Sequence, residues 1–538
     1  GAGAADQRPT GLAVGDGYLF AADECDRIVM MSLEDLRVTT VAGTPGQSGY
    51  SGEGLPGIDS RLHQPQGLHY DRHRKELVVA EFLNNRVRRL HYRWRIFVRP
   101  DGCSVESDES CLEDGGTYSY PVGSINDALA RIHEVKVEST PRPPDDDIEV
   151  VFMPAVSNIY YGQPVDWTYT MPEHSITFRP LDPNDPPIFA GCDPAAPCFD
   201  RGYEQHCRSC EDYPDEAGCP CDAQQRQENL ARCHCAGGDR RRAEEWFEYR
   251  LPGEGPGQRT NLVFDRLIVT GYQDGIGLRG QFEDDDLWVG SNSITNCIFH
   301  DLGDGAIEDF EAQKYEDRGK PRPGWAGVAL ANSRNNVVVG NTFDTLSNDY
   351  NIYEGGDTEL YMHGVYLLWY ANDNLVVDNV FKRISGDPIR VRDFSNFNTI
   401  SNNLFSRSGY EAAYGEWYCN FEQFEPDHCT KDPPEDVREC PSYENRFTDN
   451  ILDGRFSREP AGCRPLAAVY KAFELQPGSD YLQACCESPN NPWSLLPCEP
   501  AGQWNRVEEA GNVSTGGACA CLADEVQTVD DCRSLIGL

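Results

Sequence analysis

Two rows of the sequence decide the fold: HGVYLLWYANDNLVVDNVF at residues 363–381 and DPIRVRDFSNFNTISNNLF at residues 387–405. They align so that Asn379 lies 24 residues before Asn403. Each row holds short apolar pieces of period two, joined by Asn, Asp and Ser, whose side chains hydrogen-bond local backbone and tolerate left-handed dihedrals. One row cannot bury its own apolar face, but stacked rows can. The pair therefore predicts a right-handed parallel β-helix with one coil per row.

The same row recurs with insertions. Residues 327–343 end in Asn341-Thr-Phe, residues 291–299 carry Asn296, and residues 443–452 carry Asn450. We expect each Asn to stack on the Asn of the next coil and to exchange side-chain amide hydrogen bonds inside the bend, while the following apolar residue enters the core. These asparagines are therefore expected to be structural rather than catalytic.

Composition limits the partners. The chain has 538 residues, a hydrophobic share of 39% and a net charge of −41. No apolar run approaches the roughly 18 residues that a membrane helix needs, so no membrane span is expected. A surface this acidic disfavours nucleic acid and anionic membranes, and suits solubility in salt or cation binding. The first residues lack Met and an apolar signal core, which favours a processed or truncated start.

Of the 22 cysteines, 18 are crowded into residues 192–235 and 419–532. Their even number and irregular spacing favour disulfides formed outside the cytoplasm, and so a secreted, extracellular or cell-surface protein of bacterial type. Zinc is the alternative for the first cluster, because cysteine pairs there have neighbouring histidines. The residues concerned are His206, Cys207, Cys210, Cys219, Cys221, Cys233, His234 and Cys235.

A different repeat occupies the start of the chain. Residues 9–33 match residues 65–90 in Pro-x-Gly-Leu and in the Ala-Asp or Ala-Glu that follows, and Val-Ala-Gly-Thr lies between the copies at residues 41–44. This segment resembles NHL repeats, the blades of a β-propeller. The resemblance implies binding or spacing rather than catalysis. Two blades do not close a ring of roughly four to eight, so either blades precede Gly1 or this sheet caps something else.

The pattern changes at Ile96. Residues 97–132 hold a strand, a Gly-rich turn and a helical stretch with Ile125, Leu129 and Ile132 on one face. This resembles the opening of secreted right-handed β-helix proteins of the pectate-lyase-like superfamily, in which an amphipathic helix shields the first coil from edge pairing. Residues 386–405 and the insertion at 410–442 together resemble an uncharacterised bacterial subgroup of the same proteins.

The predicted chain is all-β, with insertions at residues 308–324, 346–361 and 409–442. Its parts are an NHL-repeat segment at 1–95, the β-helix cap and first coils at 96–191, a Cys-rich insertion at 192–240, further coils at 241–459, running to about Leu452, and a disulfide-rich C-terminal cap at 460–538.

One outer face gathers polar side chains. The row alignment places His363 over Asp387 and Tyr366 over Arg390, and period two sends Arg390 and Arg392 outward. The row GIGLRG at residues 275–280 places another arginine on the same face. The predicted patch, with the insertions as walls, consists of Arg279, His363, Tyr366, Tyr370, Arg390 and Arg392.

The superfamily resemblance implies a reaction for this patch: β-elimination on an acidic polysaccharide or cell-surface glycan. Such a lyase neutralises the sugar carboxylate and removes the adjacent C5 proton, often with calcium. On this reading Arg390 is base or carboxylate clamp, Arg392 a clamp, Tyr366 or His363 the proton donor, and Arg279 and Tyr370 bind substrate. Candidate calcium ligands are Asp284, Asp285, Asp286, Asp304, Glu308 and Asp309.

Other interpretations stay open. An outward arginine on a β-helix is commonly paired with a nearby carboxylate, here Asp387 or Asp393. A hydrolase with two carboxylates or a uronan epimerase would use the same fold. A non-catalytic adhesin, carbohydrate-binding module or self-associating filament subunit explains the two-blade segment and the many cysteines equally well.

Overall fold

The structure is a computed structural model. It describes residues 8–15, 18–33, 38–43, 47–50, 61–71, 76–91, 94–118, 120–138, 147–155, 158–191, 245–252, 256–281, 286–303, 324–348, 358–418, 439–457, 463–471, 507–523 and 526–537. The chain forms two compact units: Gly1–Trp94 with Pro141–Ile148, and Arg95–Thr140 with Glu149–Leu538.

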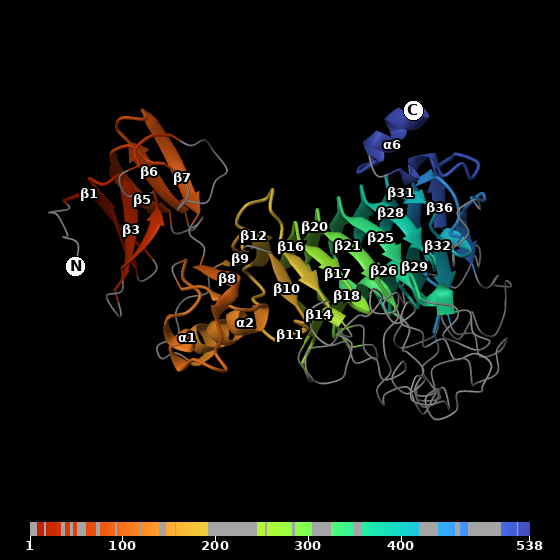
Figure 1. Ribbon diagram of the computed structural model, residues 1–538, viewed down its shortest axis with the longest axis horizontal. Helices are drawn as coiled ribbons and strands as arrows, with labels where there is room; N and C mark the ends of the chain where they lie inside the picture. Colours follow the sequence, from red (N-terminus) through yellow and green to blue (C-terminus); the bar gives the residue numbers. More distant parts are fainter. Residues whose placement is uncertain are drawn as a thin grey trace, which may run out of the picture. The chain divides into compact units, whose positions relative to one another are not determined.

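The smaller unit consists of two antiparallel sheets packed face to face (Figure 1, red). The first sheet contains β1 (Pro9–Gly15), β2 (Tyr18–Asp23), β3 (Arg27–Ser32) and β4 (Val38–Ala42). The second contains β5 (Pro65–Asp71), β6 (Glu76–Glu81) and β7 (Arg86–His91). Phe20 of the first sheet stacks on Tyr70 of the second, with ring centroids 5.3 Å apart. Each copy of the sequence repeat is thus one sheet.

The larger unit is a right-handed parallel β-helix built from three long sheets (Figure 1, yellow to blue). Pairing is parallel from β10 onward. The ten-stranded sheet contains β8 (Trp94–Cys103), β9 (Ile148–Phe152), β12 (Ile176–Pro180), β16 (Leu262–Asp265), β20 (Ser293–Thr295), β24 (Val337–Val339), β27 (Leu375–Val377), β30 (Thr399–Ser401), β33 (Asn445–Thr448) and β36 (Val507–Ala510).

The nine-stranded sheet contains β10 (Ile159–Tyr161), β13 (Ile188–Ala190), β17 (Ile268–Thr270), β21 (Ile298–Leu302), β25 (Thr342–Leu346), β28 (Val380–Ile384), β31 (Leu404–Ser406), β34 (Ile451–Leu452) and β37 (Val513–Ser514). The eight-stranded sheet contains β11 (Val165–Trp167), β14 (Glu245–Arg250), β18 (Asp274–Arg279), β22 (Ala326–Ala331), β26 (His363–Leu368), β29 (Ile389–Arg392), β32 (Ala412–Trp417) and β35 (Ala467–Lys471). A three-stranded sheet contains β15 (Gln258–Arg259), β19 (Val289–Gly290) and β23 (Ser333–Arg334).

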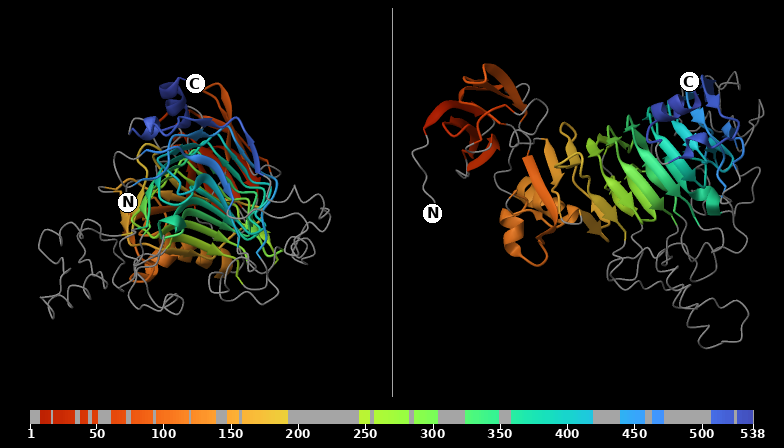
Figure 2. Two further views of the ribbon diagram at one scale, coloured as in Figure 1. Left: turned by 90° about the vertical axis from the view of Figure 1, so that its right-hand side faces the viewer. Right: turned by 45° about the horizontal axis from the view of Figure 1, so that its top comes forward.

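The predicted row register is confirmed. Val376 pairs with Ile400, and Phe381 pairs with Phe405, each 24 residues on. Looking along the stack, strands of successive coils superimpose (Figure 2, left). A column of phenylalanine rings fills the core, with centroids 5.0, 4.8 and 5.0 Å apart, formed by Phe299, Phe343, Phe381 and Phe405. Gly364 admits this column, because a Cβ there would lie 2.5 Å from the Phe381 ring.

The predicted asparagine ladder is confirmed, and the β-helix contains a second ladder of the same kind. The first runs through Asn341, Asn379, Asn403, Asn450 and Asn512. The second runs through Asn292, Asn336, Asn374, Asn398 and Asn445.

The assignment of Asn296 to the ladder is wrong. Its neighbour Cys297 occupies the position, where its backbone N–H donates to Asn341 Oδ1 at 2.9 Å. Asn296 is exposed and donates to Asp265. The chain reaches Cys297 in a left-handed bend at Asn296, so the ladder residue comes one position later than the sequence pattern indicated.

The predicted amphipathic helix is α2 (Ile125–His133), which packs against β11 and buries Ile125, Leu129 and Ile132. Ser124 caps its first turn by accepting from the Asp127 N–H. The other helical elements are α1 (Glu109–Asp114), η2 (Glu134–Glu138), η4 (Thr358–Tyr361), η7 (Ala520–Leu522) and α6 (Val529–Ile536).

Three disulfides join described cysteines: Cys103–Cys111, Cys463–Cys519 and Cys521–Cys532. The cysteines and histidines at 206–235, considered for zinc, lie outside the described residues. In the part of the chain that the structure describes, no helix is long and apolar enough to cross a membrane.

Four strands lie where none was predicted. β32 lies in the expected insertion at 409–442, and β35, β36 and β37 continue all three long sheets beyond Leu452 into the expected C-terminal cap. The coils therefore extend further than the asparagine pattern indicated.

Candidate functional site

The predicted patch maps to the outer face of the eight-stranded sheet. Tyr366 pairs with Arg390, which pairs with Gly415 on the next coil. Ile389 and Val391 are fully buried in the core, so period two places Arg390 and Arg392 outside, as the sequence predicts. Beside them, Ala329 and Leu368 extend the outer face as an apolar strip with Tyr366.

Arg390 is only partly engaged. Its Nη1 donates to Asp387 Oδ2 at 3.1 Å, and the side chain is 15% exposed. Asp387 in turn is fixed by the backbone N–H groups of Glu411 and Ala412. A guanidinium has five N–H donors; one is used here, and no other partner of Arg390 occurs among the described residues. Arg390 therefore keeps four donors for a ligand.

Arg392 is more fully engaged, with three of its five N–H donors in use. Its Nε donates to Glu439 Oε2 at 2.8 Å, its Nη2 to the other carboxylate oxygen, and its Nη1 to the Tyr366 hydroxyl at 3.4 Å. Its guanidinium carbon lies 4.5 Å from the centre of the Trp417 ring. Burial alone would lower the pKa of Arg392, but the charge of Glu439 and the Tyr366 contact raise it above its usual value. The carboxylate that pairs with Arg392 is thus Glu439, not Asp393.

Asp393 adds a second buried carboxyl to this cluster. Its Oδ1 accepts from the Cys440 N–H at 2.8 Å. Burial, and then the charge of Glu439, raise the pKa of Asp393 well above its ordinary value. Two carboxyls and one guanidinium therefore share a poorly hydrated space, which favours one bound proton.

His363 is buried beneath the patch. Its Nδ1 lies 2.8 Å from the Asp387 carbonyl oxygen, which only accepts, so the proton is on Nδ1 and the lone pair is on Nε2. Burial and the charge of Arg390 lower the pKa of His363 well below 6.5. The ring meets Tyr366 edge on, with centroids 5.1 Å apart. The neutral ring carries no proton on Nε2, so His363 cannot act there as a proton donor, and its lone pair is the group it offers.

Arg279 belongs to a separate group on the same face. Its Nη2 donates to both oxygens of Glu245 at 2.9 Å, and its Nε lies 3.1 Å from Glu248 without hydrogen-bond geometry. Burial, against the opposing charge of Arg279, raises the pKa of Glu245 to about 7. Arg279 aligns with Ala331 and, one coil further, Leu368. Apolar coils therefore separate it from Arg390 and Arg392.

Tyr370 lies apart from this group. It has a left-handed backbone, is buried, and its ring stacks on Phe394 with centroids 5.5 Å apart. The structure therefore brings together Arg390, Arg392, Tyr366 and His363, and leaves Arg279 and Tyr370 apart from them.

Of the candidate calcium ligands, Asp286 alone lies among the described residues. Asp286 is exposed, and its backbone oxygen accepts from Gly257. Asp284, Asp285, Asp304, Glu308 and Asp309 lie outside the described residues. Within the described ranges, no group of three or more His, Cys, Asp or Glu side chains is arranged to hold a metal ion.

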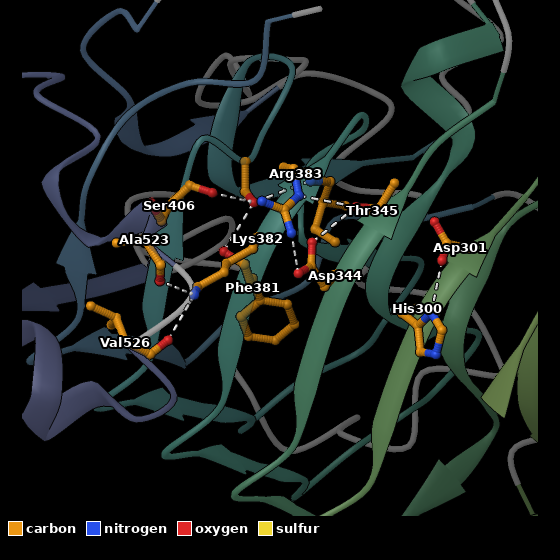
Figure 3. A network of polar contacts seen from close by, with 12 residues as sticks. His300, Asp301, Asp344, Thr345, Phe381, Lys382, Arg383, Ser406, Ala523 and Val526 are labelled. Carbon is orange, nitrogen blue, oxygen red and sulfur yellow. Dashed lines mark hydrogen bonds and ion pairs between the residues drawn. The ribbon is translucent and has the colours of Figure 1, made fainter. Parts of the chain in front are cut away.

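A second polar network, which sequence reasoning missed, lies outside the nine-stranded sheet (Figure 3). His300 Nδ1 lies 2.7 Å from Asp301, and Arg383 pairs with Asp344 and donates to Thr345. Lys382 is buried and donates to the carbonyl oxygens of Ala523 and Val526 at 3.0 and 2.7 Å. Lys382 thus fastens the C-terminal segment to this sheet.

Comparison with known proteins agrees with the fold. A family model described as a right handed beta helix region matches residues 257–422. No curated protein matches the chain.

Among solved structures, the alginate lyase from Paenibacillus sp. is 9% identical, with 78% of this chain and 95% of that chain covered and a TM-score of 0.36. The pectate lyase from Acidovorax avenae is 13% identical, with 70% and 74% covered and a TM-score of 0.30. The lacto-N-biosidase from Eubacterium ramulus is 11% identical, with 70% and 64% covered and a TM-score of 0.26. Likeness at this level carries no argument about activity. The family match and the stacked parallel sheets agree that this part of the chain is a right-handed parallel β-helix.

Proposed function

We propose that this chain is an extracellular β-helix protein that binds acidic polysaccharide on the outer face of β26, β29 and β32 and cleaves it by β-elimination. One observation carries the proposal: Arg390 keeps four N–H donors on a partly exposed guanidinium, next to a neutral histidine and a tyrosine hydroxyl. A planar guanidinium matches a uronate carboxylate in geometry and charge. The disulfides support an oxidising, extracellular setting.

The groups present suit the steps of the reaction. Arg390 would hold the uronate carboxylate and so acidify the C5 proton. His363 Nε2 would take that proton, the electrons of the C–H bond would form the C4–C5 double bond, and the C4–O bond would break. The Tyr366 hydroxyl would protonate the leaving oxygen, with Arg392 beside it. His363 is therefore assigned as base rather than donor. Binding must uncover His363 and Tyr366, which are nearly inaccessible.

The test is ultraviolet absorbance from unsaturated uronate products, with pectate, alginate and glycosaminoglycans as substrates, in calcium and in chelator. Wild type should give a rise that Arg390→Ala abolishes. Arg250→Ala is the matched control, because Arg250 projects from the same sheet, is mostly exposed and pairs with Glu248. Its trace should equal that of wild type. A flat wild-type trace on every polymer would refute the lyase.

A non-catalytic extracellular binding or structural protein is the second candidate. It is favoured by the Arg392 cluster, where Glu439 and Tyr366 accept from three of the five guanidinium N–H donors and the Trp417 ring lies against the group. Affinity electrophoresis in gels that contain each polymer distinguishes the candidates. Retardation without absorbance change supports binding alone, and regular filaments by negative-stain microscopy support a structural subunit.

A further inference from the structure

His363 and Tyr366 lie on the same side of β26, although they are three residues apart and strict alternation would separate them. The alternation is broken at the start of the strand, where the N–H groups of Gly364 and Val365 both donate to the Pro388 carbonyl oxygen, at 3.0 and 2.8 Å. In a regular strand, successive N–H groups point to opposite neighbours. The break brings the His363 ring edge on to Tyr366, with centroids 5.1 Å apart.

The group that would hold the sugar carboxylate lies on the neighbouring strand. Arg390 of β29 is in register with Tyr366 of β26, and adjacent strands are about 4.8 Å apart. The same break in alternation recurs on this coil, because the side chains of Asp387 and Arg390 are three residues apart and still meet, at 3.1 Å. The Asp387 carbonyl oxygen also fixes His363. Carboxylate clamp, base and acid therefore form one cluster on one face of the sheet.

The side from which a base and an acid act decides which sugars can react. A base takes the C5 proton from the side of the sugar ring on which that proton lies, and an acid reaches the C4 oxygen from the side on which that oxygen lies. Anti elimination needs the two groups on opposite sides of the sugar, and syn elimination needs them on one side. The His363 and Tyr366 rings are in contact, so no sugar fits between them.

We propose that this site performs syn elimination, and that its substrates are 4-linked polymers of D-mannuronate or D-glucuronate. The inference rests on the lyase proposed above and names its substrate class. In these two uronates the C5 hydrogen and the C4 oxygen lie on the same side of the ring. In D-galacturonate and L-guluronate they lie on opposite sides. Pectate and the guluronate blocks of alginate therefore bind to Arg390 through their carboxylates but are not cleaved.

The syn step balances without a co-reactant. The C5 proton passes to His363 Nε2, and the electrons of the C5–H bond form the C4–C5 double bond. The electrons of the C4–O bond leave with the oxygen, which takes the proton of the Tyr366 hydroxyl. Transfer of the imidazolium proton to the Tyr366 oxygen then restores both residues. The net change is movement of one proton from C5 to the C4 oxygen along one side of the sugar.

The experiment compares four polymers of similar length with the full wild-type chain: polymannuronate, a 4-linked polymer of D-glucuronate, polyguluronate and polygalacturonate. Ultraviolet absorbance of unsaturated uronate gives the rate on each. At least one of the first two should be cleaved. The last two should be cleaved at least about a hundredfold more slowly, because their leaving oxygen faces away from the general acid.

Two controls separate chemistry from binding. Polyguluronate, added to a cleaved polymer, should inhibit its cleavage, because the Arg390 clamp recognises a carboxylate on either kind of sugar. Tyr366→Phe should slow cleavage by roughly a hundredfold or more, since it removes the acid and keeps the ring. Polyguluronate should still inhibit the residual activity of this variant.

The outcomes distinguish this inference from the lyase itself. Cleavage of polygalacturonate or polyguluronate as fast as that of the other two polymers would overturn syn elimination and leave the lyase standing. Lack of inhibition by polyguluronate would also overturn it, because the selectivity would then lie in binding. Full activity of Tyr366→Phe would remove the acid on which the stereochemistry depends. Flat traces on all four polymers would refute the lyase, and the inference with it.

Discussion

Glu416 places a carboxyl group in the interior of the β-helix. It pairs in register with Val391, a core residue, and is itself buried. Its Oε1 accepts from the Ser442 N–H at 2.8 Å, whereas its Oε2 has no hydrogen-bond partner among the described residues. Burial raises the pKa of Glu416 from 4.5 to about 8. An ionised carboxyl at this place would be costly, so Glu416 is protonated at neutral pH.

The substitution Glu416→Gln tests whether the buried carboxyl group is protonated at neutral pH. Because the folded pKa is raised, the stability that Glu416 contributes is fully present below its unfolded pKa of 4.5 and is lost as the pH rises through about 8. The amide is neutral throughout. We expect the variant to gain on wild type by on the order of a few kcal/mol between about pH 5 and pH 8. Denaturant unfolding at several pH values measures the difference; parallel curves would contradict it.

Residue contacts at the candidate site were predictable only where they are local. Asp387 lies three positions before Arg390, and the pairing of the two was one of the open interpretations. The partner of Arg392 is 47 residues further on, at Glu439, behind an insertion of no regular period. Nothing in the sequence near Arg392 indicates it. The burial of His363 likewise depends on what covers the face, which period two does not encode.

Asparagine ladders are the element that locks one coil to the next. Asn379 accepts from the N–H and side-chain amide of Asn341, and donates to Val338, Val377 and Asn403. Each buried hydrogen bond lost without replacement leaves a desolvated partner.

Asn379→Ala should therefore cost about 2–4 kcal/mol of unfolding free energy. Asn126→Ala provides the comparison: Asn126 is exposed in the first turn of α2 and makes one side-chain bond, to Pro164. Its replacement should change stability by at most about 0.5 kcal/mol. Denaturant titration of both variants decides; equal losses would mean that the ladder contributes nothing beyond an ordinary surface amide.

The C-terminal segment is held to the nine-stranded sheet by Lys382, as Figure 3 shows. Val529 and Cys532 of α6 pack there with Val380 and Leu404. Lys382→Met leaves two carbonyl oxygens without their charged donor, so α6 should exchange its amide hydrogens faster by roughly tenfold or more. Arg383→Met is the neighbouring control, because Arg383 contacts Asp344 and Thr345 instead. Unchanged exchange of α6 in Lys382→Met would contradict this role.

Coils were predictable where the row kept its markers. Asn379 and Asn403 are each followed by an apolar residue and then phenylalanine, and those coils were placed correctly. The last ladder coil reads Asn512-Val-Ser, with no aromatic residue to enter the core, so the pattern missed it. β32 was missed because Gly415, which leaves room for the Asp387 carboxylate and Arg390, interrupts its apolar alternation.

At the scale of the whole molecule, the chain holds two separate cores. Leu77 is buried in the smaller unit, and Leu367 is buried in the β-helix. Units with their own cores unfold as separate transitions.

Calorimetry should therefore show two transitions, the larger enthalpy belonging to the β-helix because it contains more residues. Leu77→Ala should lower the unfolding free energy of the smaller unit alone, and Leu367→Ala that of the β-helix alone, each by about 2–5 kcal/mol. Each substitution should therefore shift only one of the two transitions to lower temperature. A single transition that both substitutions shift would show that the cores unfold together.

The end of the first ladder has a consequence for biosynthesis. Asn512-Val-Ser also fits the acceptor motif for N-linked glycans. In the folded chain its side-chain nitrogen donates to the Phe447 carbonyl oxygen, and its oxygen accepts from Asn450. The closing of the last coil and attachment of a sugar therefore compete for one nitrogen atom. In a host whose secretory pathway glycosylates such sites, the fraction of chains with a glycan at Asn512 therefore measures the rate of glycosylation relative to the rate at which the last coil folds.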